Sequence, residues 1–344
     1  MSLIIHIGTG KTGTTSIQAS LELNRKKLNS SGMNYPEFKK GEHNILEGAV
    51  LPFEKLHRVF RSEYSDDKNK VAVEGNELCK DIKKSIKKYS YTIISGEYFL
   101  TLDTKAINEL IGKFGLKNDD KITVICYVRQ PSSYWLSAIQ QGLKGSTKVE
   151  NVIERKYPFR AGLQNWIDVF GIENIIVRPF DRNQLLDGDV VSDFYETVYN
   201  LTNIRIENPL LAEEKNSSVS AEKCILMQEL RINLIDTDDN VFSDDSRKLI
   251  RLINANGKNL EQTKMKFHPY LAKFIDFLHS DDLEWLQNNF DVRLSMPDQI
   301  SEKDKKTAVR IFTKGRVRQM LYGFNHEVLK KYRKIVTKRF KALK

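Results

Sequence analysis

A short run of glycines, threonines and one lysine near the amino terminus has the residue types that bind phosphate. The eight residues from Gly8 to Thr15 read GTGKTGTT and follow an apolar run, Leu3 to Ile7. A strand that ends at a glycine-rich turn and continues into a helix leaves the first N–H groups of that helix directed at the turn. Lys11 adds a point charge, and the threonine hydroxyls add neutral donors. This order of residues predicts an anion site.

The loop differs in one position from the common ATP- and GTP-binding sequence, G-x-x-x-x-G-K-[ST]. Counting back from Gly10 and Lys11, the place of the leading glycine is taken by Ile5, inside the apolar run. The loop is therefore too short to wrap a triphosphate in the usual way, which favours a smaller group with fewer charges. A P-loop kinase or NTPase, with Thr12 on magnesium and Glu97 as the acidic residue of the second motif, stays an alternative.

A second segment carries residues that suit another phosphate. The β-rich apolar run from Ile122 to Val128 is followed by Arg129, by Pro131 and by a helix-like stretch that contains Ser137. Proline is well tolerated in a first helical turn. Arg129 offers a planar fork of donors that matches a phosphate. The other interpretation is an ordinary salt bridge at a strand end and a hydroxyl on a helix surface.

The two segments together resemble a known enzyme family. HIGTGKTGTTSIQ resembles the 5′-phosphosulfate loop of sulfotransferases that use 3′-phosphoadenosine 5′-phosphosulfate (PAPS), and the segment with Arg129, Pro131 and Ser137 resembles the part that holds the donor's 3′-phosphate. TIISGEYF, from Thr92 to Phe99, is similar to the family's central strand. The stretch from Leu163 to Val198 is similar to a helix, strand and helix of bacterial carbohydrate sulfotransferases. The resemblance covers about residues 2 to 225.

The resemblance implies a reaction and a set of residues for it. A sulfuryl group would move from PAPS to a hydroxyl or amine of a carbohydrate or related acceptor by in-line transfer, leaving adenosine 3′,5′-bisphosphate (PAP), with no metal required. Lys11 would stabilise the leaving oxygen. The implied donor-binding residues are Gly10, Lys11, Thr12, Gly13, Thr14, Thr15, Arg129 and Ser137, with Asn216 and Ser218 of a segment, NSSVS, that resembles an Asn-x-Ser loop of the family.

Two residues are candidates for the base that takes the acceptor's proton. Glu97 follows the apolar run Tyr91 to Ser95, and the corresponding strand end supplies the acid or base in some sulfotransferases. His43 lies in the variable stretch after the first helix, where other members place theirs, and an ordinary histidine pKa of about 6.5 suits the task. Each also has a structural interpretation: His43 as a solvated loop histidine, and Glu97 as a carboxylate paired with Lys11 or Arg129. Both candidates stay open.

Strand-like runs alternate with helix-like segments through much of the chain. The runs are Leu3 to Ile7, Tyr91 to Ser95, Ile122 to Val128 and Ile175 to Val177. This alternation predicts an α/β fold with a central parallel sheet flanked by helices, and the resemblance implies the P-loop NTPase-like form of it. The polar, charged stretch from Met33 to Lys88 predicts a substrate-facing insertion or a partly mobile loop.

We expect residues 1–243 to form the nucleotide-binding α/β domain and residues 244–344 to form a helical C-terminal extension. The extension ends in a basic amphipathic stretch, Leu329 to Lys344. Such a helix either packs its apolar stripe on the protein or lies peripherally on an anionic membrane surface. The pair Asp187 and Asp189 precedes a helix-like segment, so a helix cap accounts for it better than a metal site does.

Composition limits the function classes. The chain has 344 residues and a net charge of +10, which suits an anionic donor or glycan but also a solvated surface. A non-catalytic polyanion-binding protein is the third hypothesis, and no nucleic-acid-binding motif is found. The sequence has neither a long apolar span nor a signal peptide, which predicts a cytoplasmic protein. The cysteines at 79, 126 and 224 are widely spaced, which predicts reduced, structural thiols.

Overall fold

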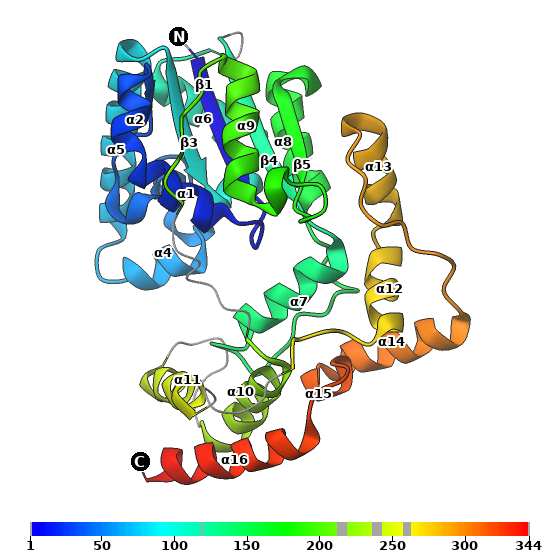
Figure 1. The fold of residues 1–344 in the computed structure, drawn as a ribbon. Coiled ribbons are helices and arrows are strands. Elements are labelled where there is room, and N and C mark those ends of the chain that lie inside the picture. Colours follow the sequence, from blue (N-terminus) through cyan, green and yellow to red (C-terminus); the bar gives the residue numbers. More distant parts are fainter. Residues whose placement is uncertain (1, 118–119, 212–218, 236–242, 257–262, 343–344) are drawn as a thin grey trace. The chain divides into compact units, whose positions relative to one another are not determined.

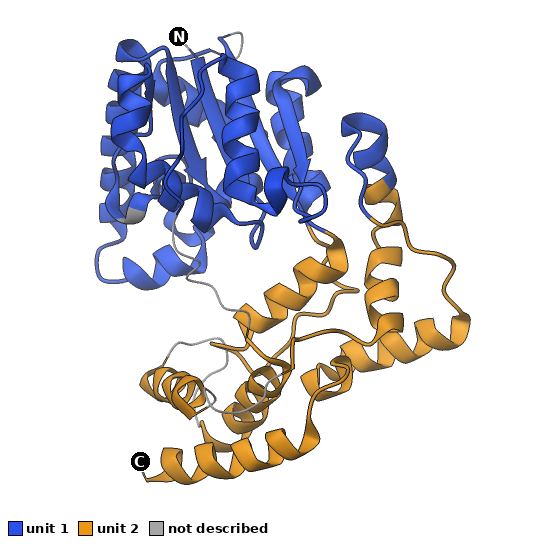
Figure 2. Cartoon of the chain, in the orientation of Figure 1, with its two compact units in different colours: residues 1–129, 158–214, 284–294 blue, residues 130–157, 215–283, 295–344 orange. Residues whose placement is uncertain are grey.

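The structure is a computed structural model that describes residues 2–117, 120–211, 219–235, 243–256 and 263–342 (Figure 1). The chain forms two compact units (Figure 2). The first comprises residues 1–129, 158–214 and 284–294, and the second comprises residues 130–157, 215–283 and 295–344. This division differs from the single boundary expected at residue 243, because the chain passes between the two units several times.

The first unit is built on a five-stranded sheet with the order β2-β3-β1-β4-β5 (Figure 1). Every neighbouring pair is parallel. The strands are β1 (Ser2–Gly8), β2 (Met33–Asn34), β3 (Tyr91–Gly96), β4 (Ile122–Val128) and β5 (Ile175–Pro179). The four strand-like runs of the sequence are therefore confirmed. The sequence analysis misses β2, since two residues are too few to show a period.

Helices cover both faces of this sheet, which confirms the α/β class. The α-helices of the unit are α1 (Thr14–Leu23), α2 (Arg25–Ser30), α3 (Glu47–Val50), α4 (Arg58–Glu63), α5 (Lys68–Lys88), α6 (Thr104–Phe114), α8 (Phe159–Phe170) and α9 (Val190–Thr202). On one face, Ile17 of α1 and Phe194 of α9 pack with Ile4 of β1 in a buried apolar cluster. The other face carries α5, α6 and α8 (Figure 1).

The stretch from Met33 to Lys88 forms regular secondary structure, so of its two expected forms the partly mobile loop is wrong. It contains β2, several short helices and the 21-residue helix α5. Asp67 caps α5 by accepting a hydrogen bond from the Lys70 N–H. Apolar residues at helical spacing are buried along α5 between charged ones: Val71, Leu78, Ile82 and Ile86. The high charge of the exposed face hides this spacing in the sequence.

The second unit is helical. Its α-helices are α7 (Pro131–Gly142), α10 (Ala221–Leu234), α11 (Asp244–Asn256), α12 (Pro269–Phe277), α14 (Glu302–Lys314), α15 (Val317–Met320) and α16 (His326–Lys341), while α13 (Ser280–Phe290) has residues of both units. The apolar stripe of α16 is buried beside α10 and α11. This confirms that the basic C-terminal helix packs on the protein. None of the described helices has the length and apolar character of a membrane span, and all three cysteines are free and buried.

Candidate active site

The glycine-rich loop lies between β1 and α1, at the carboxyl edge of the sheet (Figure 1). β1 ends at Gly8, and α1 begins at Thr14 with Gly13 as its N-cap. Gly13 makes no side-chain cap, so the start of α1 is available to an external anion. A Cβ at Gly13 would lie 2.6 Å from Val190 Cγ1, and this close packing explains why a glycine is needed there.

Two residues of the loop have a left-handed backbone conformation. The φ angle is 72° at Lys11 and 79° at Gly13. Glycine adopts this conformation freely, whereas for lysine it costs about 1–2 kcal/mol. Such a change of conformation turns successive backbone N–H groups toward one side and makes a concavity that binds anions. Strain at a non-glycine residue of a loop is an observation that points to function.

The loop threonines divide into two groups. Thr12 Oγ1 donates to the Thr9 carbonyl at 2.6 Å, and Thr9 Oγ1 donates to the Tyr127 carbonyl at 2.8 Å. These two hydroxyls brace the loop internally. Thr14 is 3% exposed, yet its Oγ1 has no hydrogen-bond partner among the described residues. A buried polar group left unpaired costs about 1–3 kcal/mol, so a ligand oxygen at the start of α1 would satisfy Thr14. Thr15 is exposed.

Arg129 follows β4 directly and reaches the loop. Its Nη1 donates to the Lys11 carbonyl at 3.1 Å, although the two residues are 118 positions apart. The register of the sheet explains the approach, because Gly8 of β1 pairs with Tyr127 of β4. The Arg129 guanidinium also lies over the Phe180 ring, 5.5 Å from its centroid. The structure thus brings the predicted loop and the predicted arginine together within the first unit.

Glu97 stands at the carboxyl end of β3 and begins the short helix η4 (Glu97–Thr101). β3 pairs with β1, so Glu97 lies beside the loop. A Cβ at Gly10 would be only 2.9 Å from Glu97 Oε1, which shows that the carboxylate lies against the loop backbone. Burial raises the pKa of Glu97, and the nearby Lys11 offsets part of this rise. A carboxyl group with a raised pKa beside a cation suits proton transfer.

His43 is fully buried at 0% exposure, so it is not a solvated loop histidine. Its Nδ1 accepts from the Ser95 N–H at 3.1 Å, and its Nε2 is 2.9 Å from the Pro36 carbonyl. The acceptor role of Nδ1 assigns the ring proton to Nε2. Burial lowers the pKa of His43 to about 4. Because both ring nitrogens are bonded to backbone groups, this geometry favours Glu97 over His43 as the base.

Ser137 is a further predicted donor-binding residue that the structure describes. Ser137 is half-buried on α7, in the second unit. The start of α7 already carries an acid, since the Asp276 carboxylate accepts from the Ser132 N–H at 2.8 Å and from the Ser132 hydroxyl at 2.9 Å. Asn216 and Ser218 lie outside the described residues.

Asp189, the second residue of the Asp-x-Asp pair, has the structural role expected of it. Asp189 Oδ1 accepts from the N–H groups of Val191 and Ser192, both at 2.9 Å, and so caps α9. The cap interpretation is thereby confirmed for Asp189. Among the described residues, no group of three or more histidine, cysteine, aspartate and glutamate side chains has a metal-binding arrangement.

Phe180 also belongs to this site, although no sequence motif points to it. Phe180 follows β5 and contacts both Arg129 and the loop, because a Cβ at Gly13 would lie 3.1 Å from its ring. The available signal was its position: residues that follow parallel strands meet at one edge of the sheet, where open α/β folds bind ligands.

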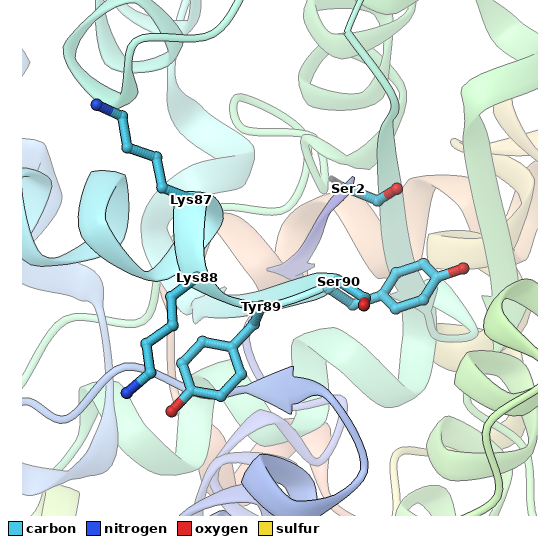
Figure 3. A pocket seen from close by; sticks show the side chains of 6 residues that line it. Ser2, Lys87, Lys88, Tyr89 and Ser90 are labelled. Carbon is cyan, nitrogen blue, oxygen red and sulfur yellow. The ribbon is translucent and has the colours of Figure 1, made fainter.

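A hollow at the opposite edge of the sheet lacks the features of the loop. It is lined by Ser2, Lys87, Lys88, Tyr89, Ser90 and Tyr91 (Figure 3). The side chains of Lys87 and Lys88 point in different directions (Figure 3). The backbone there is paired internally, since the Ser2 N–H donates to the Ser90 carbonyl at 3.0 Å. The candidate site is therefore at the carboxyl edge.

Comparisons with known proteins give few matches. No family model matches the chain. An uncharacterized protein of Archaeoglobus fulgidus is 27% identical over 147 residues, which are 41% of this chain and 38% of that protein's length. The crystal structure of a sulfotransferase from Alicyclobacillus acidocaldarius is similar over 86% of this chain and 97% of that one, with 11% identity and a TM-score of 0.39. Likeness of this degree carries no argument about activity.

Proposed function

We propose that this protein is a PAPS-dependent sulfotransferase that acts on a hydroxyl or amine of a carbohydrate or related acceptor. One observation carries the proposal: the loop places Lys11 between Arg129, a cation that binds the Lys11 carbonyl, and the partly buried carboxyl group of Glu97. A donor anion, a leaving-group cation and a proton acceptor are the parts that sulfuryl transfer requires. The sequence resemblance then names the donor.

The loop supplies the donor site in this proposal. Its N–H groups and Thr14 Oγ1 bind the phosphosulfate oxygens, with Gly10, Gly13 and Thr15 shaping the approach. The unpaired Thr14 hydroxyl supports this placement, since it is buried at the start of α1. We assign the 3′-phosphate to Arg129 and Ser137, and the nucleotide loop to Asn216 and Ser218, on the resemblance alone. No metal is needed, because a phosphosulfate carries less charge than a triphosphate.

The reaction balances with these groups. Glu97, as its carboxylate, takes the proton of the acceptor hydroxyl or amine while the acceptor atom forms a bond to sulfur. The bond between sulfur and the bridging phosphate oxygen breaks, and that oxygen keeps the electron pair. Lys11 and the loop N–H groups stabilise the charge that develops there. The products are a sulfate ester or sulfamate, PAP, and a protonated Glu97.

The hydrogen bond and burial of Thr12 favour this proposal over an ATP-dependent enzyme. In a triphosphate loop, the hydroxyl that follows the lysine binds magnesium. Here Thr12 Oγ1 donates to the Thr9 carbonyl at 2.6 Å, and the residue is 0% exposed. Ile5 also stands in the place of the leading glycine. Both observations support a smaller anion than a nucleoside triphosphate.

Thermal unfolding with two nucleotides tests the proposal. We expect PAP to raise the melting temperature and ATP with magnesium to leave it unchanged, because a ligand at about 100 times its Kd stabilises a protein by about 2.7 kcal/mol. The Lys11→Ala variant should respond less to PAP. Stabilisation by ATP with magnesium alone would replace the proposal with a kinase or NTPase. A response to neither nucleotide would favour the polyanion-binding protein.

A further inference from the structure

Two consecutive residues bond to the backbone on either side of Glu97. His43 pairs twice with Ser95: its Nδ1 accepts from the Ser95 N–H at 3.1 Å, and its own N–H donates to the Ser95 carbonyl at 2.9 Å. Asn44 Oδ1 accepts from the Tyr98 N–H at 3.2 Å. These side-chain bonds join residues that are 52 and 54 positions apart in the sequence, respectively. Glu97 is thus held from both directions along the chain.

Ser95 extends this connection to both ends of the glycine-rich loop. Its Oγ is 2.8 Å from Nδ1 of His6, on β1, and accepts from Nε2 of Gln18, on α1, at 3.2 Å. His6, Ser95 and His43 are all buried. The strand before the loop, the helix after it and the segment that carries His43 therefore share Ser95 as a common hydrogen-bonded residue.

Glu97 depends on such support because the sheet ends just before it. The last paired residue of β3 with β1 is Gly96, opposite Ile7. Beyond that point, the backbone enters a short 3₁₀ turn, which is a weaker structure than a strand or an α-helix. The Tyr98 ring adds a further support by stacking on the His57 ring, with 4.0 Å between their centroids.

We propose that His43 and Asn44 are positioning residues for Glu97, which hold its backbone so that the carboxyl group stays against Gly10. This inference rests on the proposed function, in which Glu97 takes the acceptor's proton. His43 and Asn44 act through Glu97 and do not touch the acceptor. In this role His43 contributes to catalysis while both of its ring nitrogens stay hydrogen-bonded to the backbone.

The pKa of Glu97 depends on its burial and on nearby ionisable groups, so it reports whether the carboxyl group keeps its position. Lys11 faces it from the loop, and Tyr98 lies beside it on η4. Three further ionisable groups from the neighbouring segment act on the Tyr98 phenol, namely Glu42, Glu47 and Arg58. Burial is the main cause that raises the pKa of Glu97. A Glu97 that moves into water should therefore titrate closer to its ordinary value of 4.5.

The Asn44→Ala variant removes the support on one side of Glu97. Its matched control is Asn165→Ala, because Asn165 Nδ2 also makes one bond to the backbone, at 3.0 Å to the carbonyl of Leu102. We expect Asn44→Ala to lower turnover about tenfold with an unchanged KM for PAPS, and to move the acid limb of the pH profile to lower pH. Asn165→Ala should change none of these. His43→Asn, which keeps an acceptor near Nδ1, should retain more turnover than His43→Ala.

A second measurement tests positioning without any transfer assay. Thermal stability is measured against pH for a protein that has Glu97 and for the same protein with Glu97→Gln. The difference between the two profiles reports the pKa of Glu97 in the folded state. Adding Asn44→Ala should bring that pKa down toward 4.5, whereas Asn165→Ala should leave it raised. An equal Glu97 pKa in both variants would overturn the inference. Absence of sulfate transfer by the unmodified protein would refute the proposed function and still leave this comparison decisive.

Discussion

Replacing Lys11 with glycine separates the chemical role of the lysine from its structural cost. Lys11 has a φ angle of 72°, a conformation that costs a non-glycine residue about 1–2 kcal/mol. Glycine removes that cost but adds about 0.5–1 kcal/mol of backbone entropy in the unfolded chain. The difference predicts that Lys11→Gly is as stable as the unmodified protein or about 1 kcal/mol more stable. Lys11→Ala keeps the backbone strain and should be the less stable variant.

The same two variants should be equally poor catalysts. Loss of one group that stabilises developing charge costs about 10²–10³ in turnover, or about 3–4 kcal/mol. The bond from Arg129 to the loop uses the Lys11 carbonyl, so both variants retain it. Urea unfolding measures the stabilities, and labelled sulfate release from PAPS measures the turnover. A Lys11→Gly protein less stable than Lys11→Ala would refute the strain estimate, and more than a tenth of the turnover in either variant would refute the role of the lysine.

The remaining predictions concern pH. Burial raises the pKa of Glu97 above its ordinary value of 4.5. Between pH 4.5 and this raised pKa, the folded protein therefore binds more protons than the unfolded chain, and its stability falls as the pH rises. Glu97→Gln should therefore be more stable than the unmodified protein at pH 8, equal to it near pH 4, and slower in transfer by about 10²–10⁴. Burial lowers the pKa of His43 from 6.5 to about 4. The contribution of neutral His43 to the free energy of unfolding is therefore fully present above pH 6.5 and is lost as the pH falls toward 4. Linkage predicts that the unmodified protein loses about 3 kcal/mol of stability over this pH range. If the melting temperature of His43→Asn fell as steeply with acid as that of the unmodified protein, this prediction would be contradicted.

The central strands β1, β3 and β4 could be predicted from sequence because residues on both of their faces are buried. Runs such as Ile122 to Val128 are mostly apolar, and this composition is characteristic of a central parallel strand. The order strand, glycines, lysine and helix likewise fixes where the loop lies, since the carboxyl ends of parallel strands meet at one edge. The nearby position of Glu97 follows from the same geometry.

Other features depend on tertiary contacts that no local pattern records. His43 stands in a polar stretch, and its burial comes from a strand 52 positions away. Thr12 and Thr14 are identical in type, yet the first pairs within the loop and the second is unpaired. Only the backbone path of the loop, with its left-handed residues, separates them. The contact between Arg129 and the Lys11 carbonyl likewise follows from the register of β1 and β4.

Sulfate transfer from labelled PAPS is the reaction that the proposed site should catalyse. The purified protein is incubated with the donor and a panel of glycans, and both the labelled product and PAP are measured, with Lys11→Gly as a folded control. We expect equal amounts of PAP and sulfated glycan from the unmodified protein, and about 10²–10³ less of both from Lys11→Gly. Hydrolysis of ATP by a protein that forms no PAP from any donor and acceptor pair would contradict it.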